Sequence, residues 1–380
     1  MPRSAPAVLS LFSIHPTRVG GAETFARELS SQIGAAGWLS VLSTLSAPPE
    51  PVARFLNLPN IRFETCACTT VNVRGLRQLM GILGRHRPRI LHLHFIGLVT
   101  PYAWLARAYG VERVFFTDHW SRPEGSRPAR AAFWKRALPR LTTAPLTGVV
   151  SVSDFNRSLL AALGTVPPGK ITRVYNAVDL SRTCGSSAGG EFRRRHGIPA
   201  GRRLVVQVSM IIPEKGVADL LDAAAIVLAQ DEAVHFVFVG EGAERAAYVR
   251  RAAEAGIGEH VTFTGPNPDP VAAGVFADAD VICQVSRWEE AFGWAMVEGM
   301  AFAKPVVATR VGGIPEVVED GVTGYLADRG DARQIASFIL ELLHDPAARE
   351  RMGRAGRATV ERKFELRANV RQLVELYGIS

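Results

Sequence analysis

Cysteine is scarce in this sequence, and its placement argues against two kinds of site. The 380 residues contain four cysteines, at positions 66, 68, 184 and 283. Only Cys66 and Cys68 are close in sequence, and their Cys-Ala-Cys spacing is too tight for the usual pair of zinc ligands. The four positions also form no disulfide framework. We therefore expect reduced thiols, a cytoplasmic protein and no metal site.

Long apolar runs without polar interruption are also missing. The most apolar internal run, residues 90–106, contains His92, His94 and Pro101 and is typical of a strand, a loop and a helix start. The two histidines alternate on one face, where we interpret them as structural or cleft-wall residues. The apolar run after Arg3 leads directly into HPTRVGGAE, which favours a strand entering a glycine loop over a signal peptide.

Acidic residues are few in the first half of the chain. Residues 1–180 hold 21 Lys and Arg against 9 Asp and Glu, whereas residues 181–380 hold 23 against 27. This asymmetry indicates an anionic partner for the first half. Basic residues are densest in 122–140, where Phe133 and Trp134 lie among them; this segment is either a helix on an anionic membrane surface or a solvated basic helix. No recognised binding motif accompanies the charge, so we expect no nucleic-acid partner.

Strand-like and helix-like segments alternate along the whole chain, which predicts an α/β protein with mostly parallel, doubly wound sheets. A length of 380 residues favours two domains. The small residues of CGSSAGG, 184–190, place a linker near 178–190. We predict a first domain over 1–178 and a second domain from 179 onwards.

The stretch 284–298, QVSRWEEAFGWAMVE, carries the strongest functional pattern. It ends a strand, turns through a polar loop and opens a helix near Phe292. Glu290 and Glu298 are eight positions apart, which on a continuous helix corresponds to roughly 12 Å along the axis. Two acids at that separation cannot share a proton or a metal, but they can contact two ends of one extended ligand. Backbone N–H groups at 291–294 would then face an anion.

This stretch resembles the Glu-x7-Glu signature of the family 4 retaining glycosyltransferases, which have the GT-B fold of two Rossmann-like doubly wound domains facing a cleft. Residues 295–326, with the Gly-Gly-x-Pro-Glu turn at 312–316, are similar to the nucleotide-sugar region of that family. Residues 171–179 look like its N-x-V-D segment between the domains. The resemblance implies that a C-terminal helix, 362–380, returns to the first domain and that the second domain covers 179–361.

The resemblance also implies roles for individual residues. Glu290 would contact sugar hydroxyls, His119 would contact the donor sugar near its reacting carbon, and Lys215 would neutralise the leaving diphosphate. Glu298 would accept hydrogen bonds from the ribose. The loop of Gly20 and Gly21 is similar to the family's N-terminal GGAE loop, which faces the donor diphosphate or the acceptor. The expected donor-binding positions are Glu298, Gly20, Gly21, Phe292, Gly293, Trp294, Gly240 and Met210.

Met210 departs from the family pattern. The family has Arg-x4-Lys with both cations on the diphosphate; Lys215 and the following Gly216 match, but the arginine position is Met210. One charge-assisted contact to phosphate would be missing, worth on the order of 1.5–3 kcal/mol. Our hypothesis is that Arg18 or Arg173 replaces it.

The implied activity is a retaining, metal-independent hexosyltransferase that takes a nucleotide diphosphate-sugar as co-substrate and no cofactor. We expect a UDP-sugar, with GDP-mannose as its main competitor. The expected acceptor is a sugar, a glycolipid or a polyprenyl-diphosphate-linked glycan in bacterial-type synthesis, with a small-molecule acceptor left open. Peripheral contact with the inner face of the membrane would use 122–140. Two alternatives are a nucleotide-sugar epimerase or hydrolase on the same fold, and a non-catalytic sugar-nucleotide-binding partner.

Overall fold

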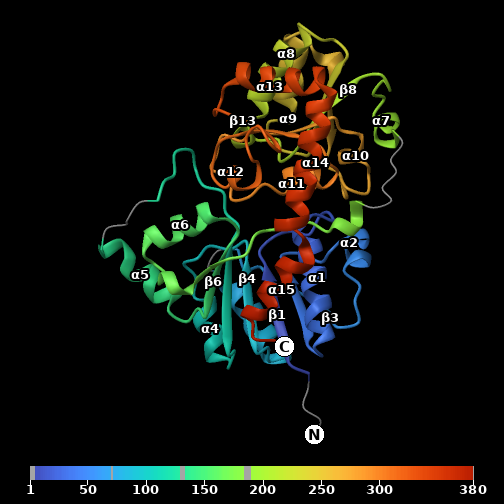
Figure 1. The fold of residues 1–380 in the computed structure, drawn as a ribbon. Helices are drawn as coiled ribbons and strands as arrows, with labels where there is room; N and C mark the ends of the chain where they lie inside the picture. Colours follow the sequence, from blue (N-terminus) through green and yellow to red (C-terminus); the bar gives the residue numbers. More distant parts are fainter. Residues whose placement is uncertain (1–4, 70–71, 129–132, 184–189, 380) are drawn as a thin grey trace. The chain divides into compact units, whose positions relative to one another are not determined.

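The computed structural model describes the chain except residues 1–4, 70–71, 129–132, 184–189 and 380, and leaves undescribed the side chains of 133–136. It divides into two compact units (Figure 1). Unit 1 comprises residues 1–120, 127–176 and 366–380, and unit 2 comprises 121–126 and 177–365. Within the described residues, no helix combines the length and the apolar character needed to cross a membrane.

The core of unit 1 is a sheet of seven strands, all of whose pairings are parallel. Its spatial order is β3-β2-β1-β4-β5-β6-β7. Every residue of β1 and β4 is buried, as expected for central strands covered by helices on both faces. The strands are β1 (Ala7–Phe12), β2 (Leu39–Thr44), β3 (Ile61–Thr65), β4 (Ile90–His94), β5 (Arg113–Asp118), β6 (Gly148–Ser151) and β7 (Ile171–Arg173).

The last helix of the chain packs in unit 1, beside its first helix. Gln32 of α1 donates a hydrogen bond to the Arg367 carbonyl of α15 at 3.0 Å. Ser153 caps α6 by accepting a hydrogen bond from the Asn156 N–H at 3.2 Å. The helices are α1 (Gly21–Ala35), α2 (Glu50–Phe55), α3 (Val73–His86), α4 (Tyr102–Ala108), α5 (Phe133–Thr143), α6 (Asp154–Leu163), η1 (Pro168–Lys170) and α15 (Leu366–Leu376).

Unit 2 is built on a six-stranded parallel sheet in the order β10-β9-β8-β11-β12-β13. Its strands are β8 (Arg203–Val208), β9 (Val234–Val239), β10 (Val261–Gly265), β11 (Val281–Gln284), β12 (Val306–Thr309) and β13 (Gly324–Ala327). Its helices are η2 (Leu180–Thr183), α7 (Glu191–Arg195), η3 (Pro213–Lys215), α8 (Val217–Leu228), α9 (Arg245–Glu254), η4 (Gly258–His260), α10 (Val275–Asp278), α11 (Trp294–Ala301), α12 (Ile314–Val317), α13 (Ala332–His344) and α14 (Pro346–Lys363).

Both sheets confirm the predicted α/β, doubly wound class. In each sheet the first three strands in the sequence are added toward one edge, and the later strands are added toward the opposite edge. The direction of addition reverses between β1 and β4 in unit 1 and between β8 and β11 in unit 2. Ligands of such sheets bind beyond the carboxyl ends of the strands at this reversal point. The terminal helix expected from residue 362 begins instead at Leu366. The preceding helix, α14, continues to Lys363, and the helical backbone is interrupted after it at Phe364.

Candidate active site

Lys215 and Glu290 follow the two strands that flank the reversal point of unit 2. Lys215 ends η3 in the loop after β8, and Glu290 lies in the loop between β11 and α11. Gly216 allows the two loops to meet: its φ is +67°, and a Cβ there would lie 1.8 Å from the Val285 carbonyl oxygen. A residue with a side chain could not make this approach, so glycine brings Lys215 to the end of β11.

Glu290 is the centre of a buried polar cluster. Its Oε1 atom lies 2.5 Å from the Lys215 Nζ and 2.5 Å from the Ser286 hydroxyl, and 3.3 Å from the Gln284 amide nitrogen. Its Oε2 atom accepts a hydrogen bond from the Ser121 hydroxyl at 2.9 Å. The Glu290 side chain is 6% exposed and that of Lys215 is 17% exposed. The sequence pattern therefore identified two residues that the fold brings into direct contact.

Charge pairing keeps the Glu290 carboxyl group ionised although it is buried. Burial by itself raises the pKa of this carboxyl, but the Lys215 charge and the hydrogen bonds from Lys215, Ser286 and Ser121 more than offset it. The net result is a pKa below the usual value for a glutamate. The site thus presents an oriented carboxylate beside a cation, an arrangement suited to holding a sugar hydroxyl next to a phosphate.

The helix expected after Glu290 starts later than predicted. α11 begins at Trp294 because Gly293 takes a left-handed conformation with φ +92°. Glu290 precedes the helix, so the separation of roughly 12 Å expected on a continuous helix from Glu290 to Glu298 does not apply. Glu298 lies within α11 and is partly buried.

Phe292 and Trp294, two of the predicted donor-binding residues, have side chains that contact other residues of unit 2. The Phe292 side chain is buried and packs edge-to-face on Phe364 at a centroid distance of 5.4 Å. The Trp294 indole N–H donates to the Ala177 carbonyl at 3.3 Å. The Phe292 ring therefore belongs to the packing of unit 2, and any donor contact at that position would come from its backbone.

Met210 and Gly240 lie in the loops after β8 and β9. The Met210 side chain is 58% exposed. Gly240 has φ +149°, and a Cβ there would lie 1.9 Å from the Ser209 carbonyl oxygen, so glycine lets these two loops pack closely. Both proposed replacements for the missing arginine, Arg18 and Arg173, belong to unit 1. Arg173 pairs there with Asp154 at 3.3 Å.

The Gly20–Gly21 loop begins α1 in unit 1. The Gly20 N–H donates to the Glu23 carboxylate at 3.0 Å, so this N–H has a partner within the loop. Glu23 is 7% exposed, and its burial raises the pKa of its carboxyl above the ordinary value. Gly20 and Gly21 thus lie at the carboxyl end of β1, where the doubly wound fold places ligands.

His119 follows β5 in unit 1 and belongs to a stack of histidines. Its ring lies on Phe95 at a centroid distance of 4.1 Å, and its Nε2 is 3.2 Å from the His94 Nδ1. Burial lowers the pKa of His119 to about 3. Burial, together with the other histidines, also holds the pKa values of His92 and His94 well below the usual range. These rings are therefore neutral near pH 7.

His92 connects this stack to Tyr377, the residue that follows α15. Its Nδ1 is 2.5 Å from the Tyr377 hydroxyl and its Nε2 is 2.7 Å from the Thr117 hydroxyl. Both side-chain nitrogens of His92 are thus used inside the fold, which gives this histidine a structural role. No group of three His, Cys, Asp or Glu residues in the described part of the chain has the arrangement of a metal site. Cys184 lies outside the described residues.

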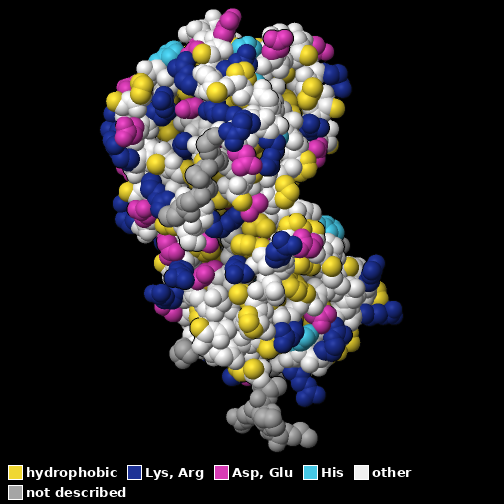
Figure 2. Space-filling view, turned by 90° about the vertical axis from the view of Figure 1, so that its right-hand side faces the viewer, with side chains coloured by type: hydrophobic (Ala, Val, Ile, Leu, Met, Phe, Trp, Pro, Cys, Tyr) yellow, Lys and Arg dark blue, Asp and Glu magenta, His cyan; other side chains and the backbone are white. Residues whose placement is uncertain are grey.

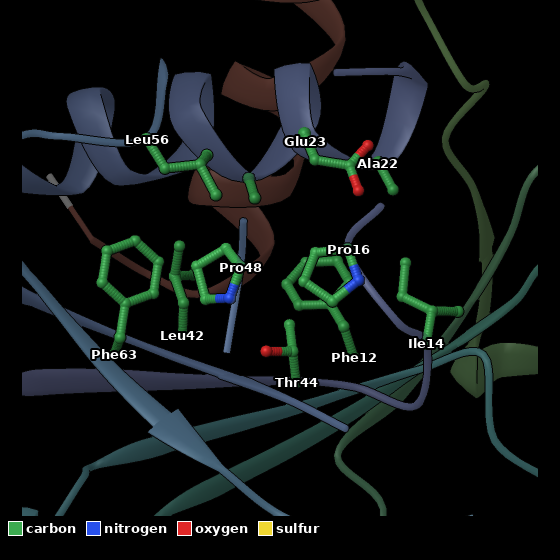
Figure 3. A pocket seen from close by; sticks show the side chains of 11 residues that line it. Phe12, Ile14, Pro16, Ala22, Glu23, Leu42, Thr44, Pro48, Leu56 and Phe63 are labelled. Atoms are coloured by element: carbon green, nitrogen blue, oxygen red, sulfur yellow. The ribbon is translucent and has the colours of Figure 1, made fainter. Parts of the chain in front are cut away.

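A separate pocket lies between α1 and the strands at one edge of the unit 1 sheet. Eleven residues line it, and all are apolar except Thr44 and Glu23. Figure 3 shows the Glu23 carboxyl group beside Ala22 and Pro16. The empty space is about 350 Å³, open solvent included. The side of unit 1 that carries α2 and β3 faces the viewer in Figure 2, where hydrophobic side chains lie between Lys and Arg side chains.

Several residues of the Glu290 cluster were not foreseen. Ser121 comes from a segment far from Glu290 in sequence, and no local pattern marks it. Gln284 and Ser286 are polar residues that alternate with the apolar Cys283 and Val285 at the end of β11, and this alternation could have indicated that the two polar side chains lie on one face.

Comparisons with known proteins show the family and the fold of the chain. The family model described as "Glycosyl transferases group 1" matches residues 190–359, and the one described as "Glycosyltransferase Family 4" matches residues 19–182. A GDP-mannose-dependent alpha-(1-6)-phosphatidylinositol monomannoside mannosyltransferase of Mycolicibacterium smegmatis is 31% identical, over 72% of this chain and 72% of that protein. A D-inositol 3-phosphate glycosyltransferase of Thermomonospora curvata is 29% identical over 94% of this chain and 90% of that protein.

Coverage differs among the relatives. The chain spans 55% and 51% of the length of two other curated relatives that it matches. Among solved structures, HepE of Anabaena in complex with UDP and glucose superposes with a TM-score of 0.78 at 18% identity, over 99% of this chain and 100% of that chain. That structure supports the fold, and the sequence matches support the family. The chain therefore belongs to family 4 of the glycosyltransferases and has their GT-B fold.

Proposed function

We propose that the protein transfers a hexose from a UDP-sugar to a lipid-linked or phosphate-bearing acceptor, with retention of the anomeric configuration. The observation that carries this proposal is the contact between Lys215 and Glu290 at the reversal point of unit 2. A cation beside an ionised carboxylate suits a ligand that carries phosphate at one position and hydroxyl groups next to it. A nucleotide diphosphate-sugar has both groups.

Each site residue has a role in the proposed reaction. Lys215 neutralises the charge that develops on the leaving diphosphate, where electrostatic stabilisation contributes most to the rate. Glu290 accepts hydrogen bonds from sugar hydroxyls, and Glu298 accepts them from the ribose. His119 contacts the donor sugar as a neutral imidazole, consistent with its lowered pKa. Attack occurs on the face from which the diphosphate leaves, and the donor phosphate takes the acceptor proton, without a metal or a cofactor.

UDP is the nucleotide that we propose for the donor. The HepE structure, whose fold covers nearly the whole of this chain, contains UDP and glucose. The name of the mannosyltransferase relative gives GDP-mannose as the competing donor. The exposed Met210, at the position of the family arginine, predicts weaker binding of the diphosphate than in a relative that keeps both cations.

The acceptor proposal rests on the basic first half of the chain and on the surface of α5. Leu138 and Leu141 are 63% and 59% exposed, and Trp104 donates from its indole nitrogen to the Leu141 carbonyl at 2.8 Å. Apolar side chains next to basic residues suit peripheral contact with an anionic membrane through 122–140. The expectation of a membrane-surface helix was based on Phe133 and Trp134. The structure does not describe the side chains of these two residues.

A thermal-shift panel with UDP, GDP, ADP, dTDP and CMP tests the donor. A nucleotide present at about 100 times its dissociation constant adds about 2.7 kcal/mol of stability. We expect stabilisation by UDP that is lost in Lys215→Ala and in Glu298→Ala. Stabilisation by GDP alone would show that the donor is a GDP-sugar and not a UDP-sugar. Stabilisation by none of the five nucleotides would reject the proposed donor site.

Product analysis separates transfer from the two rival functions. With a UDP-sugar and an acceptor extract, a transferase forms a glycosylated acceptor and UDP. A hydrolase releases free sugar without an acceptor, and an epimerase converts the donor into its epimer. A non-catalytic partner binds the nucleotide and turns over nothing.

A further inference from the structure

A short segment of the chain leaves unit 1, packs in unit 2 and then returns. Residues 121–126, SRPEGS, belong to unit 2, whereas the residues before and after them belong to unit 1. We call this segment the strap. It pairs with the site loop through two backbone hydrogen bonds of 2.9 Å each, from the Arg122 N–H to the Glu289 carbonyl and from the Glu289 N–H to the Arg122 carbonyl. The strap is therefore in register with the residue next to Glu290.

The Glu289 side chain anchors the strap. It is buried, with 7% of the residue exposed, and it accepts hydrogen bonds from the Gly125 N–H at 3.1 Å and the Gly312 N–H at 2.7 Å. Arg329 pairs with the same carboxylate and also reaches Glu124 of the strap at 3.2 Å. A buried carboxylate with this many donors holds its partners firmly, because losing one of them leaves charge uncompensated. The strap is thus fastened at both its backbone and its side chains.

Ser121 is the strap residue that reaches Glu290. Its hydroxyl donates to Oε2 of Glu290 at 2.9 Å and accepts from the Ala291 N–H at 3.3 Å. Lys215, Ser286 and Gln284 all contact the other oxygen, Oε1. The terminal torsion of a glutamate is broad and weakly restricted by its own sterics. A contact on each oxygen is therefore needed to fix the plane of the carboxylate.

We propose that Ser121 is a positioning residue for Glu290, held in place by the strap and its Glu289–Arg329 anchor. This inference rests on the proposed function, in which Glu290 receives the sugar hydroxyls. Ser121 sets the direction in which the remaining lone pair of Oε2 points, and Lys215 and Ser286 set that of Oε1. Through the strap, a residue from the first half of the sequence, Ser121, becomes part of the site that is otherwise formed by residues of the second half.

Three variants separate positioning from a purely structural role. Ser121→Ala removes the hydroxyl, Ser121→Thr keeps it, and Ser126→Ala is a matched control in the same segment whose hydroxyl is not used in this arrangement. We expect Ser121→Ala to lower kcat about tenfold or more, as for loss of one hydrogen bond to a charged group. The donor KM and the UDP-induced thermal shift should stay near those of the parent protein. Ser121→Thr should restore most of kcat.

A titration that needs no turnover completes the test. In protein labelled at the glutamate carboxyl carbons, the Glu290 signal is assigned by its loss in Glu290→Gln. Ser121→Ala should shift the titration of Glu290 to higher pH, since a hydrogen bond to the ionised form is lost, whereas Ser126→Ala should not. An unshifted Glu290 titration in Ser121→Ala, or a Ser121→Thr variant that behaves as Ser121→Ala, would overturn the proposal. A parent protein without transferase activity would reject the proposed function, while the titration would still decide the role of Ser121.

Discussion

The Nζ of Lys215 lies 2.5 Å from Oε1 of Glu290, and both side chains are largely buried. The cation proposed to bind the donor diphosphate is therefore already paired with the carboxylate proposed to bind the sugar. A bound diphosphate would share the Lys215 charge with Glu290 and would not meet an unpaired cation. Because the pair is buried, each partner offsets the desolvation of the other.

This pair leads to a prediction about stability. Lys215→Met leaves the Glu290 carboxylate buried without its cation, and breaking a buried pair in this way costs about 3–5 kcal/mol. The double variant Lys215→Met/Glu290→Gln removes both charges and should recover a large part of that loss. Urea denaturation of the two single variants and the double variant measures the coupling. Strictly additive losses would contradict the pairing.

The second prediction concerns Gly216. Gly216→Ala places a Cβ 1.8 Å from the Val285 carbonyl oxygen, so the loop that carries Lys215 must move away from β11. We expect a loss well above the 1–2 kcal/mol that a left-handed conformation alone costs a residue with a side chain. Gly37→Ala is the matched control, because Gly37 has φ +79° and nothing lies within 4 Å of its Cβ position. Equal denaturation midpoints for the two variants would refute the close approach.

The third prediction concerns pH. In the folded protein the pKa of His119 is lowered to about 3, and those of His92 and His94 are also well below the ordinary value. Between about pH 6.5 and the folded pKa values, only the unfolded chain binds these protons, so unfolding is favoured as the pH falls. Stability should therefore be greatest above about pH 6.5 and decline below it.

The slope of stability against pH identifies the histidines responsible. Each histidine that is protonated only in the unfolded chain contributes about 1.36 kcal/mol per pH unit. His119→Gln should reduce the slope between pH 6 and pH 4 by about one proton, whatever it does to absolute stability. An unchanged slope would show that His119 is not held neutral by the fold.

The fourth prediction concerns the link between Tyr377 and His92. Tyr377→Phe removes the hydroxyl that lies 2.5 Å from the His92 Nδ1 and leaves a buried nitrogen without that partner. Such a loss costs about 1–3 kcal/mol. Tyr109→Phe serves as the control because Tyr109 is 39% exposed and should change the free energy of unfolding by less than about 0.5 kcal/mol. Chemical denaturation gives both values, and similar effects of the two variants would argue against a structural role for the bond.

The sequence predicted those features that depend on local pattern. Alternating strand and helix signals gave the doubly wound class, and the Glu290 and Lys215 motifs fell on loops after parallel strands, whose carboxyl ends share one edge. Helix starts were less certain, since α11 depends on the left-handed backbone of Gly293 and not on the apolar pattern. Phe292 looks the same in the sequence whether its ring faces a ligand or packs against Phe364.

Long-range pairings could not be predicted from one sequence. The Ser121 contact with Glu290 joins residues 169 positions apart, and the Tyr377 contact with His92 joins residues 285 positions apart. Ser121 and Tyr377 carry no signature of their own, because serine and tyrosine occur throughout loops and helix ends. Part of the strap's attachment consists of backbone hydrogen bonds between Arg122 and Glu289, which are available to almost any sequence.

The order in which the chain is synthesised gives the position of α15 a further consequence. Unit 1 contains residues from both ends of the sequence, and Tyr377 near the C-terminus bonds to His92 in its central strand. During translation, unit 2 has all its residues once residue 365 has emerged, whereas unit 1 lacks α15 until residues 366–376 have left the ribosome. The side of α1 that packs against α15 therefore stays uncovered in the nascent chain, although all the other residues of unit 1 lie within the first 176 positions and are made before most of unit 2.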